Sequence, residues 1–203
     1  GDQGSVTVTI TNPTFNSPVS TSICAGESAQ LVVNYSNGIS PTYQWQIDVG
    51  GSWVPVTDNV PNVGALYSGS NTQALSIDGL SQTALYRLQI NDAGPNCGIT
   101  NTSAATVTVN SQPDALDSIS TSGSGCGSLT LTANSNEITG GGYTAEWFED
   151  ANNNGTLEEG IDVSLGSGTT IQATTVGTYD IFARQRNIST GCSGPAIALN
   201  ITI

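Results

Sequence analysis

A short alternating segment occurs three times in the chain and limits what the chain can fold into. Residues 5–11 read Ser-Val-Thr-Val-Thr-Ile-Thr, and comparable segments occupy residues 104–109 and 197–203. Each alternates apolar and small polar side chains, which predicts a β-strand with one buried and one solvent-exposed face. The second and third copies each follow a cysteine, a tryptophan, a tyrosine and another cysteine, whereas the first copy follows nothing. We therefore expect two repeats preceded by an extra strand, which is either the tail of a preceding repeat or a strand donated to a neighbouring molecule.

The spacing of the marker residues predicts the domain boundaries. The first cysteine and the tryptophan recur after 102 residues, the tyrosine after 93 and the second cysteine after 95. The pairs are Cys24 and Cys126, Trp45 and Trp147, Tyr86 and Tyr179, and Cys97 and Cys192. Such a period indicates two tandem copies of one domain. Because Pro113 ends strand pairing, we expect an N-terminal strand over 1–12, a first domain over 13–112 and a second over 113–203.

The strand pattern of the first repeat indicates an all-β fold. Alternating runs near residues 29–33, 43–47, 53–56, 75–77 and 86–90 are separated by turns rich in Gly, Asn and Pro. About seven short strands, with a tryptophan on the third and a tyrosine opening the sixth, are typical of an immunoglobulin-like β-sandwich. The chain is therefore expected to form two such sandwiches in tandem, with a buried tryptophan in each.

Charge and residue types narrow the classes of function. The chain has 16 acidic residues against three arginines and no lysine, for a net charge of -13, which disfavours binding to nucleic acid or to an anionic membrane. No apolar run is long enough for membrane insertion. Histidine, the commonest general base, is absent, and we expect no enzymatic activity. The four cysteines predict structural disulfides and an oxidising, extracellular compartment.

Several motifs are similar to those of a known group of repeats. They are Tyr43–Gln46, Gly50-Gly51, Trp53, Tyr67–Gly69, Ala74–Ile77, Tyr86-Arg87 and 103–109 in the first half, and Cys126–Leu131, Glu146–Phe148, Leu165–Gly168 and Gly191-Cys192 in the second. With them the chain resembles the tandem immunoglobulin-like repeats of secreted Bacteroidota surface proteins, including gliding adhesins and cell-surface filaments. The resemblance implies spacer and display modules. One departure is Leu88, which stands where many immunoglobulin domains place a cysteine.

The first strand suggests how such modules would assemble. Val6, Val8 and Ile10 present an apolar face that needs a partner, because a lone strand is not stable in water. We expect it to complete a sheet in a neighbouring copy or repeat, within a structural or adhesive surface fibre. The alternative function is a carbohydrate-binding accessory module of a secreted enzyme. In that module Trp53 and Tyr67 would stack on surface glycans, unless Trp53 packs across its hairpin onto the outer sheet face.

Residues 150–162 follow the spacing of a calcium-binding loop. Oxygen ligands stand at the first, third and fifth places, glycine at the sixth and a hydrophobic residue at the eighth. The candidate ligands are Asp150, Asn152, Asn154, the Thr156 carbonyl, Glu158 and Asp162. Ile161 occupies the twelfth place, where a bidentate acid normally stands, so a standard helix-flanked loop is excluded. The alternative is a solvated hairpin turn rich in Asn and Gly.

Two schemes of disulfide pairing are compatible with the sequence. Symmetry predicts Cys24 with Cys97 and Cys126 with Cys192. In an ordinary immunoglobulin sandwich, however, the turns that hold Cys24 and Cys97 lie at opposite ends, roughly 20 Å apart, whereas a disulfide spans at most about 7 Å between Cα atoms. A bridge from Cys24 to Cys192 would join the two domains and leave Cys97 and Cys126 for the preceding and following units.

One further site follows from a short motif. Asp117-Ser118-Ile119 resembles the O-glycosylation sequence of Bacteroidota proteins and lies just after the domain boundary. The resemblance implies a glycan on Ser118. The alternative, compatible with it, is a plain strand that enters the second domain.

Overall fold

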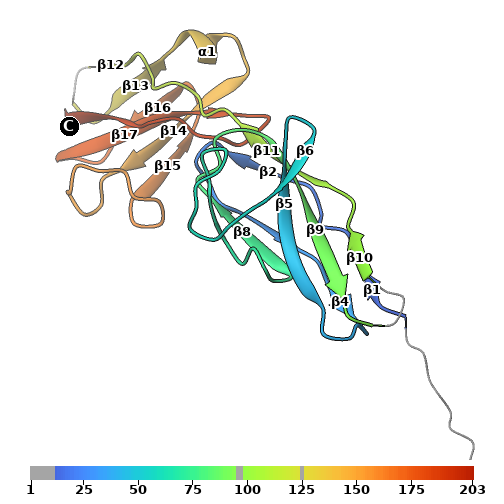
Figure 1. Cartoon of the computed structure of the whole chain (residues 1–203). Coiled ribbons are helices and arrows are strands. Elements are labelled where there is room, and N and C mark those ends of the chain that lie inside the picture. The colour runs from blue at the N-terminus through green and yellow to red at the C-terminus, as the bar shows by residue number, and fades with distance from the viewer. Residues whose placement is uncertain (1–11, 95–97, 124–125) are drawn as a thin grey trace, which may run out of the picture. The chain divides into compact units, whose positions relative to one another are not determined.

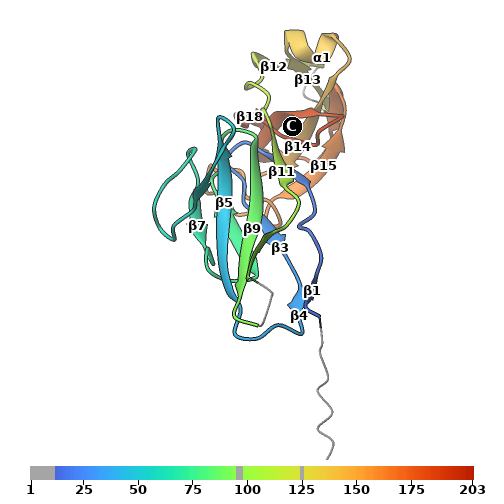
Figure 2. The same cartoon turned by 45° about the vertical axis from the view of Figure 1, so that its right-hand side comes forward.

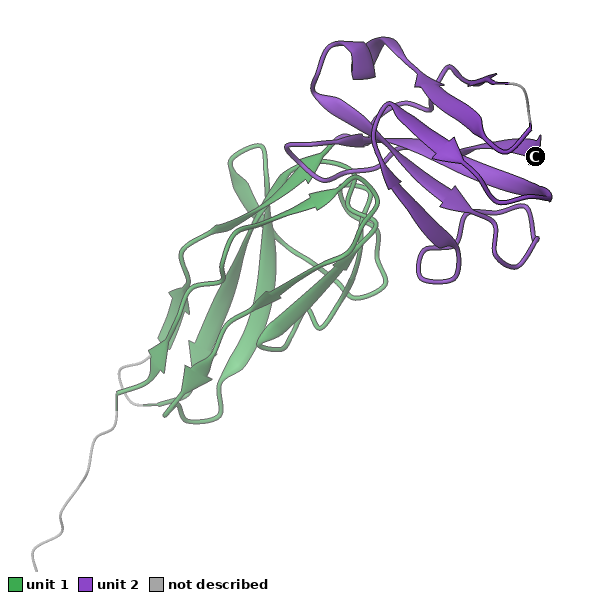
Figure 3. Cartoon of the chain, turned by 180° about the vertical axis from the view of Figure 1, so that it is seen from behind, with its two compact units in different colours: residues 1–110 green, residues 111–203 purple. Residues whose placement is uncertain are grey.

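The computed structural model describes residues 12–94, 98–123 and 126–203, and these residues form an almost entirely β protein. The chain divides into two compact units, Gly1–Asn110 and Ser111–Ile203 (Figure 3). Each unit has its own cluster of buried apolar side chains. Among the described residues, no helix is long and apolar enough to cross a membrane.

Unit 1 is built from eleven short strands within the described residues. They are β1 (Thr14–Phe15), β2 (Thr21–Cys24), β3 (Ala29–Val32), β4 (Tyr35–Ser36), β5 (Thr42–Val49), β6 (Ser52–Pro55), β7 (Leu66–Ser68), β8 (Ala74–Asp78), β9 (Ala84–Asp92), β10 (Gly98–Asn101) and β11 (Ala105–Asn110). Gly50 and Gly51, both with positive φ, form the tight turn between β5 and β6.

The strands of unit 1 form a two-layer sandwich (Figures 1 and 2). One sheet has the order β2-β11-β9-β5-β6, with β10 also on β9, and the other has the order β3-β8-β7. β2 runs parallel to β11, whereas the other pairs are antiparallel. Before β2 the chain changes sheets: Asn16 still bonds to Asn34 after β3, and Ser17 already accepts from Ser103 before β11. Pro18, which has no N–H to donate, stands at this crossing.

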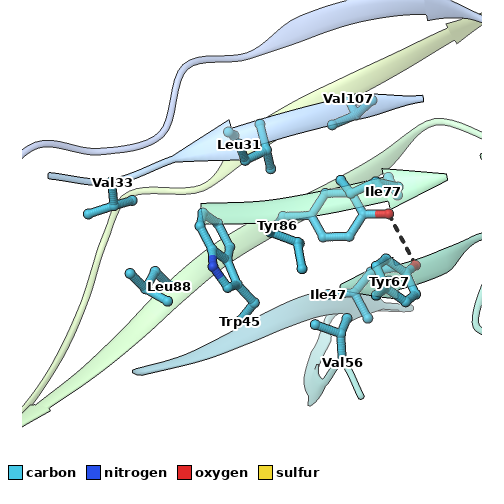
Figure 4. Close-up of a cluster of buried hydrophobic side chains, with 14 of the residues drawn as sticks. Leu31, Val33, Trp45, Ile47, Val56, Tyr67, Ile77, Tyr86, Leu88 and Val107 are labelled. Carbon is cyan, nitrogen blue, oxygen red and sulfur yellow. Dashed lines mark hydrogen bonds between the residues drawn. The ribbon is translucent and has the colours of Figure 1, made fainter. Parts of the chain in front are cut away.

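The core of unit 1 surrounds Trp45, which is fully buried as predicted. Its indole N–H donates to the Thr72 carbonyl over 3.0 Å, so the one polar atom of the ring is satisfied. Figure 4 shows Leu31 and Leu88 in the same cluster, where a disulfide is found in many immunoglobulin domains. Apolar packing therefore holds the two sheets of this domain together at its centre.

Unit 2 is a smaller sandwich. Its elements are β12 (Ser118–Ser122), β13 (Leu129–Asn134), α1 (Asn136–Thr139), β14 (Tyr143–Glu149), β15 (Val163–Ser167), β16 (Thr170–Ala173), β17 (Thr178–Asn187) and β18 (Ile197–Thr202). One sheet has the order β12-β13-β16 and the other β15-β14-β17-β18, all antiparallel. Trp147 is buried on β14, again as predicted, and its indole N–H donates to the Gly168 carbonyl over 2.8 Å. The predicted class of all-β, immunoglobulin-like sandwiches is confirmed by these strand orders.

The strand registers correct one expected correspondence between the repeats. Trp45 lies opposite Leu88, and Trp147 lies opposite Ala183. Counting along the strands from these pairs aligns Tyr86 with Ile181, so Tyr179 is not its counterpart. Tyr179 is only half-buried and donates its hydroxyl to the Thr175 carbonyl over 3.1 Å. At the place of Tyr86 the second domain therefore has Ile181, and its Tyr179 lies two residues nearer the start of the strand.

Candidate functional site

The acidic loop 150–162 joins β14 to β15 in unit 2. The aspartates at its two ends are almost fully buried, with 3% of Asp150 and 8% of Asp162 exposed. Each accepts backbone N–H groups: Gly155 donates to Asp150 Oδ2 over 2.8 Å, and Glu158 donates to Asp162 Oδ2 over 2.7 Å. These hydrogen bonds stabilise two carboxylates whose burial would otherwise be costly.

Asp162 also closes the loop onto its own beginning. The Ala151 N–H donates to Asp162 Oδ1 over 3.1 Å, whereas Ile161, at the twelfth place, is 56% exposed. The acid that closes this loop is therefore its thirteenth residue, one place later than in a standard calcium loop. The sequence shows the same departure, because Ile161 stands at the twelfth place and Asp162 follows it.

Amide side chains hold the middle of the loop together. Asn152 and Asn154 each donate through Nδ2 to Glu158 Oε2, over 2.7 and 2.6 Å. Thr156 donates its N–H and its hydroxyl to Asn154 Oδ1, both over 2.8 Å. In this arrangement, no three acidic, cysteine or histidine side chains of the described residues are grouped so that they could hold a metal ion. Neither buried aspartate takes part in the ion pairs of the described chain.

A charge cluster on the outer face of the β14–β17 pair, with Arg184 and Glu146 mostly buried, was missed by sequence reasoning. Arg184 Nε and Arg186 Nη1 donate to the two carboxylate oxygens of Glu146 over 2.8 and 2.6 Å, and Ser193 adds a third bond over 3.1 Å. Arg184 also pairs with Glu159. Burial by itself raises the pKa of Glu146, but the bonds from Arg186 and Arg184 outweigh it and hold that pKa below its usual value. The available signal was that two of three arginines stand two positions apart, and so on one face of a strand.

The two aromatic residues proposed for glycan contact lie in different environments. Tyr67 is on β7 with 2% of its surface exposed, and its hydroxyl lies 3.2 Å from that of Tyr86 (Figure 4). The ring of Tyr67 fills the core, so it does not lie where a surface glycan could stack on it. Trp53 is half-buried on β6, with the Arg87 guanidinium 4.4 Å from its ring centroid. Arg87 is fixed by Gln46, which accepts from its Nε over 2.8 Å.

Two cysteines are disulfide-bonded, Cys24 in unit 1 and Cys192 in unit 2. Cys24 ends β2, where it lies opposite Asn110, the last residue of β11. Cys192 is 1% exposed and lies two residues before Gly194, whose backbone packs so closely on the Pro113 carbonyl oxygen that an added Cβ would collide with it. Each half-cystine therefore sits beside the segment through which the chain leaves unit 1 or enters unit 2.

The remaining expected sites are placed as follows. Ser118 is exposed at the start of β12, and its hydroxyl lies 3.2 Å from Asn134 Nδ2. Cys126 is exposed before β13. Cys97 and the assembly strand with Val6, Val8 and Ile10 lie outside the described residues, so the strand proposal stays a prediction.

Comparisons with known proteins assign no family to the chain. No family model matches the chain, and no curated protein matches it. One similar solved structure is described as "Crystal structure of Dpr11 IG1 bound to DIP-gamma IG+IG2". It shares 17% sequence identity, over 94% of this chain and 96% of that one, with a TM-score of 0.39. That level of likeness assigns neither a partner nor an activity to this chain.

Proposed function

We propose that the chain is a structural or adhesive segment of an extracellular bacterial surface fibre, built from immunoglobulin-like domains placed end to end. Its resemblance to secreted Bacteroidota surface repeats supports this function. The observation that carries it is the position of the two disulfide-bonded cysteines, each beside the segment that connects the domains. A fibre under tension needs strong connections between its domains. A disulfide between the domains would add a second covalent connection to that of the polypeptide chain.

The connecting segment is short enough for one bridge between Cys24 and Cys192. Only Ser111 and Gln112 separate Asn110 from Pro113. The Cα atoms of Asn110 and Pro113 therefore lie at most about 10 Å apart.

The symmetric alternative would have to reach much further. Gly98, the first described residue after Cys97, lies opposite Asp92 at the far end of β9. Val107, three residues before Asn110, lies opposite Ala84 at its start. Asp92 and Ala84 are eight residues apart on β9, and Asn110, opposite Cys24, lies three residues beyond Val107. Gly98 and Asn110 are therefore separated by eleven residues along the strands, or roughly 35 Å, which is far beyond the reach of a disulfide.

Peptide mapping under non-reducing conditions tests the bridge. We expect a linked peptide that contains Cys24 and Cys192, which disappears on reduction. A Cys192→Ser variant should release the Cys24 thiol to alkylation, whereas Cys126→Ser, the matched control, should leave it protected. Recovery of a linked Cys24 and Cys97 peptide would contradict the proposal.

End-to-end assembly would use the first strand. The face formed by Val6, Val8 and Ile10 is uncharged and alternates with threonine, which suits addition to a sheet edge in another copy. Electron microscopy of the full chain should show fibres with a regular subunit repeat. A chain that begins at Pro18 should fold, because the buried core residues all come later, but should not assemble. Fibres of the same repeat from that shorter chain would refute this route.

We also propose that calcium binds the acidic loop of unit 2. Two buried aspartates that form no ion pair within the described residues favour this site, with Asp162 closing it. To coordinate the ion, Asn152 and Asn154 would turn their amide oxygens inward and release Glu158.

Thermal unfolding tests the calcium site. We expect millimolar calcium to raise the Tm of unit 2 by mass action and a chelator to lower it. The exposed-acid control Asp114→Asn should retain the shift, whereas Asp162→Asn should abolish it. A wild-type Tm that ignores calcium would remove the ion from the proposal.

Carbohydrate binding remains the rival function. Because Tyr67 is buried, Trp53 is the remaining candidate residue for glycan contact. Soluble glycans that bind the isolated chain, with loss of binding in Trp53→Ala, would favour an accessory module. We expect no such binding, because Arg87 covers the Trp53 ring.

A further inference from the structure

The two domains differ at one sheet edge. In unit 1, β2 pairs in parallel with β11 and covers its outer edge from Val107 to Asn110. In unit 2, the corresponding last strand is β18, because Ile201 lies opposite Tyr179 as Val107 lies opposite Ala84. β18 ends its sheet, and no described strand pairs with its outer side. Among its described residues, unit 2 thus has no counterpart of the strand that completes this sheet in unit 1.

The hydrogen-bond pattern identifies the backbone groups that face outward from this edge. Gly177 and Ile203 exchange both of their backbone hydrogen bonds, over 3.0 and 2.9 Å. In an antiparallel ladder such pairs alternate with pairs that do not bond to each other. The N–H and C=O groups of Ala198, Asn200 and Thr202 therefore point away from β17, and all three residues are exposed.

The side chains beside this edge are only partly covered. Ile197 and Leu199 on β18, and Ile119 on β12 in the other sheet, are half-buried members of the unit 2 core. In unit 1, Ala105 at the place of Leu199 is fully buried, and Ile23 of β2 packs against that core. An added strand at β18 would cover the corresponding apolar surface.

β18 also lacks the features that usually protect an edge. Proteins block exposed edges with short strands, proline, charges or bulges. With six residues, β18 is the longest edge strand among the described residues, and it contains no proline and no charged side chain. By contrast β6 ends in Pro55, and β15 carries a bulge at Leu165. β3, an edge strand of the smaller sheet of unit 1, has four residues.

We infer that β18 is the acceptor edge for residues 5–11 of a second copy, which add parallel to it as β2 adds to β11. This inference rests on the proposed end-to-end function and names its docking surface. The donor carries Val6, Val8 and Ile10 at the period of a strand, and it is uncharged like the edge it would meet. Donor and acceptor are different surfaces at different ends of the sequence, so repeated addition produces an open linear polymer.

Hydrogen exchange of the full chain with a synthetic peptide of residues 1–12 tests the acceptor independently of fibre formation. The amides of Ala198, Asn200 and Thr202 should exchange quickly in dilute protein and about tenfold more slowly with saturating peptide. A peptide with Val6, Val8 and Ile10 replaced by serine is the control and should protect none of them. Protection of β3 instead of β18, or of neither edge, overturns the inference.

Two matched variants locate the acceptor in the assembling protein. Ala198→Pro removes an outward N–H from β18, and Gln30→Pro does the same on β3, where Val33 bonds inward to Gln73 and so Gln30 faces out. We expect fibres to be lost in Ala198→Pro and retained in Gln30→Pro. The opposite result moves the acceptor to unit 1 and overturns the inference. Fibres from both variants also overturn the inference but leave the proposed fibre function intact. Wild-type protein that forms no fibres would count against the fibre function alone, because the peptide experiment still identifies the acceptor edge.

Discussion

In both units the strand of the central tryptophan pairs with an equivalent neighbour, β5 with β9 in unit 1 and β14 with β17 in unit 2. The residues around the two tryptophans nevertheless differ. In unit 1 the core includes Tyr67 and Tyr86, whose hydroxyls meet inside the sandwich. In unit 2, Ile181 stands at the place of Tyr86. There the ion pairs lie on the outer face of the sheet, where two arginines bind Glu146. The same sandwich is therefore stabilised by buried phenols in one domain and by an ionic cluster in the other.

The comparison predicts two separate unfolding units. Trp45→Ala and Trp147→Ala each remove a fully buried ring and its indole hydrogen bond, and each should lower the free energy of unfolding by about 3–5 kcal/mol. Because each ring belongs to its own core, calorimetry should show that each change shifts one transition. Equal shifts of both transitions in either variant would mean that the domains unfold as one.

The second-largest effect concerns the ionic cluster. Glu146→Gln leaves Arg184 and Arg186 without their shared carboxylate and should destabilise unit 2 by about 1–2 kcal/mol, a modest value because water still reaches Arg186. The wild-type pKa of Glu146 is lowered by the arginines, so its contribution is present above its ordinary pKa and is lost as pH falls below it.

Denaturant titrations of unit 2 from pH 7 to pH 3 would measure this loss. Glu146→Gln should flatten the acid dependence, whereas Glu27→Gln, a matched change in unit 1, should not. An unchanged acid profile of unit 2 in Glu146→Gln would show that the cluster does not stabilise the fold.

The fold was readable from the sequence because its strongest signals are local. Alternation on the strands and the flanking turns identify Trp45 and Trp147 as core residues without knowledge of their partners. Tyr67 was misplaced because it follows a turn-rich stretch, and its burial depends on Tyr86, nineteen residues away. The calcium-loop spacing was visible, but the closing role of Asp162 depends on how the loop folds back to Ala151. Pairing across strands, which sequence spacing does not encode, also decides the partners of Glu146.

A smaller effect is expected from the tyrosine pair at high pH. Burial raises the pKa of Tyr86 above its ordinary value, with a further contribution from Tyr67, whose own pKa is raised by burial. A raised pKa means that the stabilising contribution is complete below about pH 10 and is lost as pH rises above it. Burial also raises the pKa of Tyr179 in unit 2, but the shift is larger at Tyr86. Unit 1 should therefore lose more stability in alkali than unit 2.

Tyr86→Phe tests this by removing one of the two hydroxyls. It should cost about 1 kcal/mol at neutral pH, from the lost hydrogen bond, and should reduce the alkaline loss of unit 1. Tyr179→Phe, whose ring is half-buried in unit 2, is the control and should leave unit 1 unchanged. An alkaline profile of unit 1 that persists in Tyr86→Phe would assign the sensitivity to another group.

The smallest expected effect compares the arginine and aromatic pairs on the outer faces. Arg87 lies 4.4 Å from the Trp53 ring centroid in unit 1, and Arg184 lies 5.2 Å from that of Phe148 in unit 2. A double-mutant cycle with Trp53→Ala and Arg87→Ala should give a coupling of about 0.5–1 kcal/mol, the range for exposed cation–π pairs. The cycle on Phe148 and Arg184 should give a weaker coupling, because the distance is longer and Arg184 is already held by Glu146. If the unit 1 coupling is absent, Trp53 is not fixed by Arg87, and its face would be open to the glycans of the rival function.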